Sequence, residues 1–291
     1  MARFFELVFI ILLSLSVSAQ DDYSYVGALK LNDSSLITYK LDFIEKDGLI
    51  TGYSTTDIGG AHETKSFISG YFDDEASSLS FYESGILYTK SEIVQDDFCF
   101  VHFDGRLRKM NENQRIEGEF KGLYDDGEEC INGEIMLSNF KKILKRTEKL
   151  DRKINRSILV SKEKKSKIDL VKMLDSLQLN VIRKDEVLTV FSKSDVVNLA
   201  IYDAGQVDGD RISVYINDEY ILENYTVTNL KKKIKVVLKD KKTVIKVIAL
   251  NNGSIGGNTV KIDVFDNTNT IETLTNLKAR ETASFVILRK D

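Results

Sequence analysis

Asp203-Ala-Gly-Gln-Val-Asp208-Gly-Asp210, followed directly by Arg211-Ile-Ser-Val-Tyr-Ile-Asn217, is the stretch that decides how the second half of this chain folds. In its second part, apolar side chains occupy every second position, as in a strand with one buried face. In its first part, three carboxylates fall within eight residues. An acidic turn between two strands forms either a rigid hairpin or a calcium pocket. Neither outcome by itself identifies a biochemical activity.

The same alternation continues on both sides of this stretch. Val, Ile, Leu, Tyr and Phe recur at every second position in the runs 187–191, 196–202, 211–217, 220–227, 233–239, 243–250, 259–265, 271–275 and 283–289. Turn signals such as Asp240-Lys-Lys242 and Asn251-Asn-Gly253 separate them. So many short strands in about 110 residues predict a two-sheet, Ig-like or jelly-roll-like β-sandwich over residues 180–291.

A spaced pattern in this half resembles a β-sandwich module of secreted bacterial proteins that has no established activity. The pattern is Asp203-x-Gly205-x-x-Asp208-Gly-Asp210-x-Ile-x-Val-x-Ile-Asn217, with Ala249-Leu-Asn-Asn-Gly253 and Asn258-Thr259 downstream. Members of that module commonly carry prolines before the Asn-Thr pair. This chain has Ser254-Ile-Gly-Gly257 there and contains no proline, so the stiffness of that loop is not implied.

The acidic turn offers the oxygen ligands that calcium prefers. Calcium takes six to eight oxygens from carboxylates, amides and backbone carbonyls. Asp203, Asp208 and Asp210, with the amides of Gln206 and Asn217, therefore predict a calcium site. The spacing is not that of an EF-hand loop. The alternative is a surface hairpin in which Asp-Gly serves turn geometry and Asp203 caps nearby N–H groups.

The first half predicts a different β architecture. Candidate strands are 24–31, 36–45, 49–56, 63–72, 78–90, 98–103, 114–121 and 130–137. Turn signals between them include Lys46-Asp-Gly48 and Asp125-Asp-Gly127. Eight strands with short connections predict an antiparallel up-and-down β-barrel over residues 20–139, because closure removes exposed sheet edges.

A weak repeat supports the barrel. Ile-x-Gly recurs inside four strand patterns, at Ile50-Thr-Gly52, Ile68-Ser-Gly70, Ile116-Glu-Gly118 and Ile131-Asn-Gly133. Glycine weakens a strand unless geometry requires it, and the tight coiling of a narrow barrel wall is such a reason.

The segments Gly48-Leu-Ile-Thr-Gly-Tyr53 and Ile68-Ser-Gly-Tyr-Phe-Asp73 resemble the paired strands of lipocalin-like and avidin-like barrels. Biotin-binding members line their site with tryptophan, and this chain has none, so that ligand chemistry is not implied. The aromatic residues of this half either fill the barrel or line a ligand cavity.

The N-terminus has the features of a secretory signal peptide at residues 1–19. Arg3 precedes an apolar run from Leu7 to Leu15, and Val17-Ser-Ala19 offers a cleavage site near Ala19. The run is shorter than the roughly 20 residues of a membrane-spanning helix. We therefore expect a protein without a transmembrane span that is secreted, periplasmic or attached to the cell surface.

Charge divides the chain into segments. Residues 20–140 contain 24 acidic and 10 basic residues, whereas residues 141–167 contain 12 basic and 3 acidic ones. Helical spacing of apolar residues predicts helices at 140–157 and 168–178 within a basic connector, 140–179.

No aromatic residue lies in 141–190, which disfavours nucleic acid as a partner. An envelope protein or a glycan is the expected partner class, and a solvated helix face is the simplest role for the connector.

Cys99 and Cys130 are the two cysteines of the chain. Export to an oxidising compartment favours a disulfide between them. In a plain meander one strand would lie between the two cysteine strands. Their separation of about 9–10 Å would then exceed the Cα–Cα distance that a disulfide tolerates. The disulfide therefore requires the two strand ends to converge.

The sequence contains few of the residues and motifs that enzymes use for catalysis, and no catalytic residue is predicted. The histidines are His62 and His102, both placed in barrel strand patterns, and neither a serine-nucleophile elbow nor a phosphate-binding loop is present. Apart from calcium, no cofactor is expected.

Three functions remain open. The leading one is a non-enzymatic binding or assembly protein of the cell envelope. The second is a small-molecule carrier that uses the barrel cavity. The third is a carboxylate-pair hydrolase resembling a glycosidase, with candidate acids at Asp73, Asp74, Glu83 and the Asp203 cluster.

Overall fold

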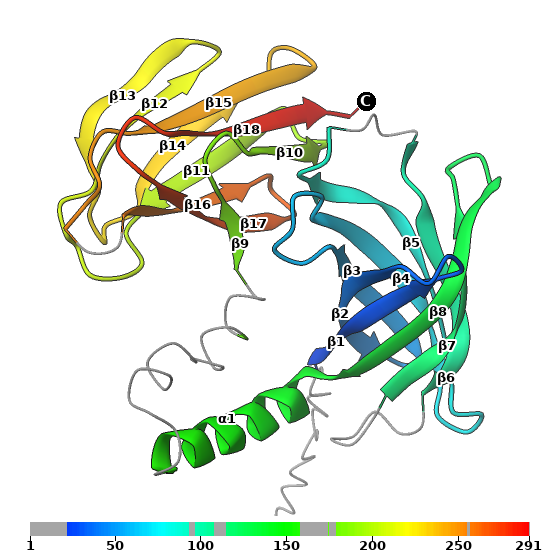
Figure 1. Cartoon of the computed structure of the whole chain (residues 1–291). Coiled ribbons are helices and arrows are strands. Elements are labelled where there is room, and N and C mark those ends of the chain that lie inside the picture. The colour runs from blue at the N-terminus through cyan, green and yellow to red at the C-terminus, as the bar shows by residue number, and fades with distance from the viewer. Residues whose placement is uncertain are drawn as a thin grey trace, which may run out of the picture.

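The computed structural model describes residues 22–92, 97–107, 115–157, 174, 179–254 and 257–290. Within these residues the protein is mainly β and consists of a closed barrel and a two-sheet sandwich, with helix α1 after the barrel (Figure 1). The predicted fold class is confirmed. The predicted signal peptide, with its cleavage point near Ala19, lies outside the described residues.

Eight antiparallel strands form the barrel. They are β1 (Asp22–Leu31), β2 (Leu36–Lys46), β3 (Leu49–Thr56), β4 (Thr64–Asp73), β5 (Ser78–Thr89), β6 (Phe100–Leu107), β7 (Arg115–Leu123) and β8 (Glu129–Asn139). Each strand pairs with the next, and β8 pairs with β1 to close the wall. The meander predicted from the turn signals is therefore confirmed.

The barrel interior is filled by its own side chains. Alternate residues of every strand point inward, as Tyr39, Leu41 and Phe43 do on β2. Seventeen buried apolar residues from all eight strands form one cluster. Of the two roles considered for the aromatic residues, this packing favours a side-chain core.

The glycines of the Ile-x-Gly repeat lie where neighbouring strands approach closely. A Cβ atom on Gly52, Gly70 or Gly133 would collide with a backbone carbonyl of the adjacent strand. Gly118 instead faces the ring of Phe103 and the backbone of Gly105. The tight coiling inferred from the repeat is therefore present in the wall.

The disulfide joins Cys99, just before β6, to Cys130 on β8, with 6.1 Å between the two Cα atoms. Strand β7 runs between them, and the bridge crosses it at Gly122, where a Cβ would collide with the Cys99 sulfur. The register of β7 and β8 shifts between Lys121 and Leu123. The strand ends thus converge as a disulfide requires, and the glycine that permits the crossing was not recognised from sequence.

Helix α1 (Phe140–Arg156) follows β8 directly, close to its predicted bounds. The Asn139 side chain caps its N-terminus by accepting from the Lys142 N–H, and Lys153 and Arg156 lie in its last turn. Phe140 is the one buried residue of α1. The second predicted helix, 168–178, lies outside the described residues except at Leu174.

The sandwich consists of ten strands. They are β9 (Asn180–Ile182), β10 (Val187–Ser192), β11 (Val196–Tyr202), β12 (Arg211–Ile216), β13 (Glu219–Thr226), β14 (Lys232–Val237), β15 (Lys242–Ala249), β16 (Asn258–Phe265), β17 (Thr270–Leu277) and β18 (Thr282–Arg289). One layer has the order β14-β11-β16-β17-β9 and the other the order β13-β12-β15-β18-β10. Nine of these strands were predicted, whereas the short β9 was missed. Its pairing with β17 and that of β10 with β18 are parallel.

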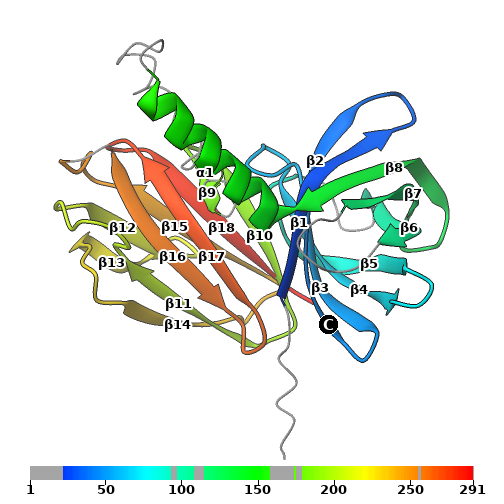
Figure 2. The ribbon, with the colours of Figure 1, turned by 90° about the horizontal axis from the view of Figure 1, so that it is seen from below.

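Strand β5 connects the two bodies, which sequence periodicity did not reveal. Its first half pairs with β6, and its last residues, Tyr88 and Thr89, pair with β10 of the sandwich. Figure 2 shows the sandwich and the barrel side by side. Between the two halves the register with β4 shifts, and Gly85 has φ +109°. Such a bulge bends a strand and increases its twist. The 13-stranded sheet therefore runs from the barrel into the sandwich.

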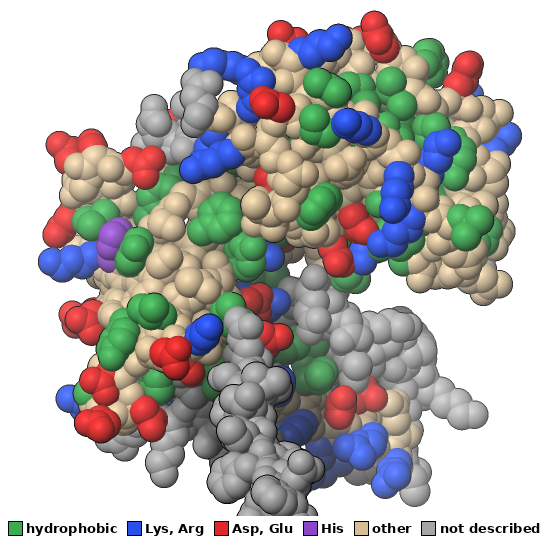
Figure 3. All heavy atoms as spheres, turned by 180° about the vertical axis from the view of Figure 1, so that it is seen from behind, with side chains coloured by type: hydrophobic (Ala, Val, Ile, Leu, Met, Phe, Trp, Pro, Cys, Tyr) green, Lys and Arg blue, Asp and Glu red, His purple; other side chains and the backbone are tan. Residues whose placement is uncertain are grey.

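A small apolar cluster fills the fork where β5 leaves β6. Ile86, Phe100 and Phe191 are buried there, with Phe98 and Leu288 packed against them. Leu87 and Tyr88 belong to the core of the sandwich. Seen from behind, the two bodies meet in one continuous surface (Figure 3).

Candidate functional site

The acidic turn predicted as a calcium site lies between β11 and β12, and both its ends are fixed by backbone hydrogen bonds. The Asp203 N–H donates to the Thr228 carbonyl over 2.9 Å, and the Asp210 carbonyl accepts from the Val227 N–H at 2.8 Å. The turn is thus held against the segment that follows β13.

The structure brings Asp203, Asp208 and Asp210 together. One carboxylate oxygen from each lies within 4.8 Å of the others. Asp203 and Asp210 are 6% and 1% exposed, whereas Asp208 is half-buried. Ionised carboxylates at this depth repel one another unless a cation or a proton lies between them.

Three backbone N–H groups orient the carboxylates. Asp203 Oδ1 accepts from Gly205 at 2.7 Å, Asp208 Oδ2 from Ser254 at 2.8 Å, and Asp210 Oδ2 from Thr259 at 2.8 Å. The other oxygen of Asp210, Oδ1, is buried without a hydrogen-bond partner among the described residues. A bare buried carboxylate oxygen is costly, and a metal ion is one way to satisfy it.

Gly253 keeps space open beside this oxygen. It has φ +62°, and a Cβ there would collide with Asp210 Oδ1 and would lie 2.8 Å from Asp208 Oδ2 and 3.1 Å from the Gly257 carbonyl. Two carboxylate oxygens and a backbone carbonyl therefore converge on one point. These are oxygen types that calcium uses.

Burial raises the pKa of Asp210 to about 6, and the charges of Asp208 and Asp203 act in the same direction. The hydrogen bond from the Thr259 N–H opposes this shift. At neutral pH the cluster therefore carries repulsive negative charge, which a divalent cation would neutralise. A hollow of about 400 Å³, lined in part by Asp203, Asp208 and Gln206, lies beside the cluster.

Asn217, the fourth predicted ligand, is not part of the cluster. It lies in the turn after β12, at the far end of that strand from Asp210, and its Oδ1 accepts from the Val244 N–H at 2.9 Å. It has φ +48° and serves the turn between β12 and β13. Because six residues of extended chain separate it from Asp210, it cannot share an ion with the three aspartates.

Residues 251–259 contribute groups that were recognised as part of the module pattern but not as part of the site. Ser254 and Thr259 supply two of the N–H donors, and Gly253 supplies the open space. The buried Asn258 donates to the Arg211 carbonyl and to Asn251, while its Oδ1 has no partner among the described residues. The loop before β16 therefore completes the cluster.

Of the acids considered for hydrolysis, the Asp203 cluster is gathered as described above, whereas Glu83 and Asp73 of the barrel lie apart. Glu83 points into the barrel and accepts from Tyr39 Oη at 2.9 Å, Ser54 Oγ at 2.5 Å and the Val101 N–H at 2.8 Å. Asp73 lies at the far end of β4, where its side chain caps the turn before β5. The strand pairing separates Glu83 from Asp73 by five residues along β4.

The histidines are also apart. His62 lies in the loop between β3 and β4, which corrects its placement in a strand, and its Nδ1 is 3.2 Å from Ser91 Oγ. His102 is on β6 as predicted, and its ring stacks on that of Tyr82 with 5.9 Å between centroids. Partial burial lowers the pKa of His102.

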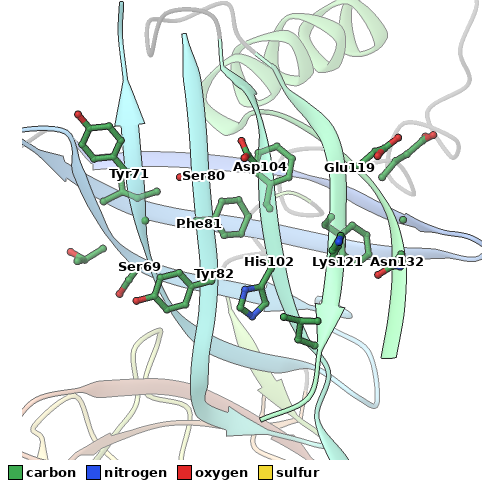
Figure 4. Close-up of a pocket in the computed structure, with 18 of the residues that line it drawn as sticks. Ser69, Tyr71, Ser80, Phe81, Tyr82, His102, Asp104, Glu119, Lys121 and Asn132 are labelled. Carbon is green, nitrogen blue, oxygen red and sulfur yellow. The ribbon is translucent and has the colours of Figure 1, made fainter. Parts of the chain in front are cut away.

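A shallow, open groove of about 1110 Å³ crosses the outer wall of the barrel over β3–β8 (Figure 4). Tyr71 and Tyr82, 50% and 45% exposed, lie on it with His102 beside Tyr82. Polar side chains surround these rings, among them Asp104, Glu119, Lys121 and Asn132. The sequence pattern indicated only a core or an inner cavity for the aromatic residues and gave no sign of this outer face.

Comparison of the chain with protein-family models, with curated proteins and with solved structures finds no match. In the part of the chain that the structure describes, no helix has the length and apolar character needed to cross a membrane.

Proposed function

We propose that this protein is a secreted, non-enzymatic binding or assembly protein of the cell envelope whose sandwich is stabilised by calcium. The ion would be held by Asp203, Asp208 and Asp210. The observation that carries the proposal is the gathering of three carboxylates within 4.8 Å, one of which, Asp210, has a buried and unpartnered Oδ1 among the described residues. Disulfide bonding of Cys99 to Cys130 supports an oxidising location.

Calcium would act on the sandwich as a structural ion. Asp203 and Asp210 flank the turn between β11 and β12, and Asp208 is bonded to the loop before β16. One ion would therefore fix two loops at the same end of the sandwich. The module that the pattern resembles has no established activity, which is consistent with a structural or binding role.

Calorimetric titration of the calcium-free protein tests this proposal. Calcium should bind with about one ion per chain, and Asp210→Asn should abolish the heat. Asp218→Asn is a matched control, because Asp218 lies in the turn at the opposite end of β12 and pairs with Lys246. Absence of heat with calcium, together with an unchanged melting temperature on chelation, would overturn the proposal.

The outer groove of the barrel supports a glycan as the partner. The exposed faces of Tyr71 and Tyr82 offer surfaces on which sugar rings stack, and the carboxylate, amide and ammonium groups around them can bond sugar hydroxyls. Affinity electrophoresis in envelope polysaccharides should show retardation that Tyr82→Ala removes and Tyr124→Ala, at an exposed tyrosine outside the groove, leaves unchanged. Equal retardation of both variants would contradict this assignment.

The filled barrel disfavours the carrier alternative. Seventeen side chains occupy its interior, and the large groove lies on the outside. A carrier would need an enclosed apolar pocket of at least about 300 Å³.

A further inference from the structure

A polar pocket of about 250 Å³ lies where the barrel meets the sandwich. Its barrel side is formed by β2–β5 and the loop before β4, and its sandwich side by β9 and β17. The residues that matter for its chemistry are Asp42, Glu63, Lys65, Tyr88, Asn180 and Glu272. The calcium ligands and the outer groove do not line this pocket, although Asn180 and Glu272 also line the hollow beside Asp203 and Asp208.

Each carboxylate that lines the pocket already has its own lysine. Asp42 pairs with Lys40 at 2.9 Å, Glu63 with Lys90 at 3.7 Å, and Glu272 with Lys261 at 2.5 Å. Glu63 also accepts from the Gly59 N–H and from Tyr88 Oη, at 2.6 and 2.9 Å. These acids are therefore satisfied within the protein.

Lys65 also lines the pocket, and it takes part in none of these three ion pairs. It is half-buried, and among the described residues its ammonium group has neither a salt bridge nor a hydrogen bond. Its Nζ lies over the ring of Tyr53, 4.5 Å from the centroid. Burial lowers its pKa, although Asp42, Glu63 and Glu272 act to raise it. The positive charge of Lys65 is therefore not neutralised by any of the three ion pairs.

Asn180 provides a second unsatisfied group. The residue is 7% exposed, and neither Oδ1 nor Nδ2 of its side chain makes a hydrogen bond of standard geometry among the described residues. Its amide lies near the Tyr88 hydroxyl, whose pKa burial raises and the amide acts to lower. Its backbone is fixed by the pairing of β9 with β17, in which Asn180 lies opposite Thr273. A buried amide with both ends unpaired costs free energy that a bound ligand would recover.

We propose that this pocket binds a small carboxylate that carries an adjacent N–H or O–H donor, as in α-amino and α-hydroxy acids. The carboxylate would pair with Lys65 Nζ and accept from Asn180 Nδ2, and the adjacent donor would bond Asn180 Oδ1. The volume equals that of about eight water molecules at ~30 Å³ each, which limits the ligand to a few non-hydrogen atoms.

The position of the pocket gives binding a structural consequence. Lys65 belongs to the barrel and Asn180 to the sandwich, so a ligand that contacts both would join the two bodies. The protein already joins them nearby, where Lys90 Nζ donates to the Val181 carbonyl at 2.9 Å. Binding should therefore stabilise the junction formed by β5 and β10.

Titration of the full mature chain with L-lactate and L-alanine, followed by NMR, tests the proposal. L-lactamide is the matched neutral control, because it keeps the hydroxyl and loses the charge. We expect saturable shifts with lactate or alanine, and affinity about tenfold or more weaker for lactamide and for Lys65→Met and Asn180→Ala. Lys46→Met, at the exposed end of β2, should bind as the wild type does.

Three results would overturn the proposal. One is the absence of saturable shifts with both acids, and another is equal binding of lactamide. The third is unchanged affinity in both pocket variants. The calcium response of Lys65→Met should equal that of the wild type, which shows that the variant is folded and keeps this test separate from the calcium proposal.

Discussion

Two buried carboxylates, Glu83 in the barrel and Asp210 in the sandwich, show how the same chemical group serves different purposes. Burial raises the pKa of both. Glu83 accepts from two hydroxyls and one backbone N–H, so both its oxygens have donors. Asp210 has one donor, one bare oxygen and two acidic neighbours. Hydrogen bonds within the barrel satisfy both oxygens of Glu83. At Asp210, a bound cation would satisfy the unpartnered oxygen and offset the repulsion of the two neighbouring carboxylates.

The difference extends to the regions around them. The barrel is held by seventeen packed side chains, glycines at close strand contacts and a disulfide, and the Tyr25 hydroxyl is its one buried side-chain polar atom without a partner among the described residues. The loop end of the sandwich instead leaves polar atoms of Asp210 and Asn258 without partners among the described residues. We therefore expect the barrel to be stable without ligands and the sandwich to gain stability from calcium.

Removal of the disulfide should have the largest effect. The double substitution Cys99→Ala and Cys130→Ala opens a loop with a sequence separation of 31, and should lower the free energy of unfolding by about 3–4 kcal/mol. Urea denaturation of the calcium-free protein measures this. Calcium affinity should not change, because the bridge lies in the barrel. Weakened calcium binding in this variant would show that the two regions are not independent.

Calcium removal should follow in size. At a free calcium concentration one hundred times Kd, the ion should add about 2.7 kcal/mol to the free energy of unfolding. Asp210→Asn should lose this gain, because the site loses one carboxylate. Urea denaturation with and without a chelator gives the difference. A gain of similar size in Asp210→Asn would place calcium elsewhere.

The pH dependence of the calcium-free protein should carry the signature of Asp210. Its folded pKa of about 6 lies above the unfolded value of about 3.9. The folded state therefore binds the proton more tightly, and this contribution to stability is fully present below about pH 4 and lost as the pH rises through 6. Calcium affinity should change in the opposite direction, because the ion requires the deprotonated carboxylate.

The difference in unfolding free energy between wild type and Asp210→Asn isolates this group from the other acids. We expect that difference to vary between about pH 4 and pH 6 and to be constant at higher pH. A difference that does not vary with pH would contradict the raised pKa.

Replacement of Asn217 should have the smallest effect. Asn217→Gly keeps the positive φ of the turn and removes one acceptor for the Val244 N–H. The expected loss is about 1 kcal/mol or less, with calcium affinity unchanged by calorimetry. A loss of calcium binding would restore Asn217 to the ligand set.

The sequence predicted most strands because period-2 alternation and Asp-Gly turns are local signals. It also predicted the disulfide and the three clustered aspartates. The pairing of β5 with β10 was not predictable in the same way, because the break in alternation at Gly85 and the apolar run Ile86-Leu-Tyr88 do not show which strand pairs there. The pocket at Lys65 and Asn180 depends on that long-range contact and was missed with it. Asn217 was assigned to the site because it is close to Asp210 in sequence, but the extended strand β12 places it at the opposite end of that strand.

The most direct test compares Glu83→Gln with Asp210→Asn in thermal denaturation, with and without calcium. Without calcium, Glu83→Gln should melt below the wild type, because an amide nitrogen would face a donor. Asp210→Asn should melt above it, because a repelling charge is removed. Calcium should raise the melting temperature of Glu83→Gln as it does that of the wild type, and leave that of Asp210→Asn unchanged. If Asp210→Asn instead melts below the wild type without calcium, or still responds to the ion, the contrast between a self-sufficient barrel and a calcium-dependent sandwich is wrong.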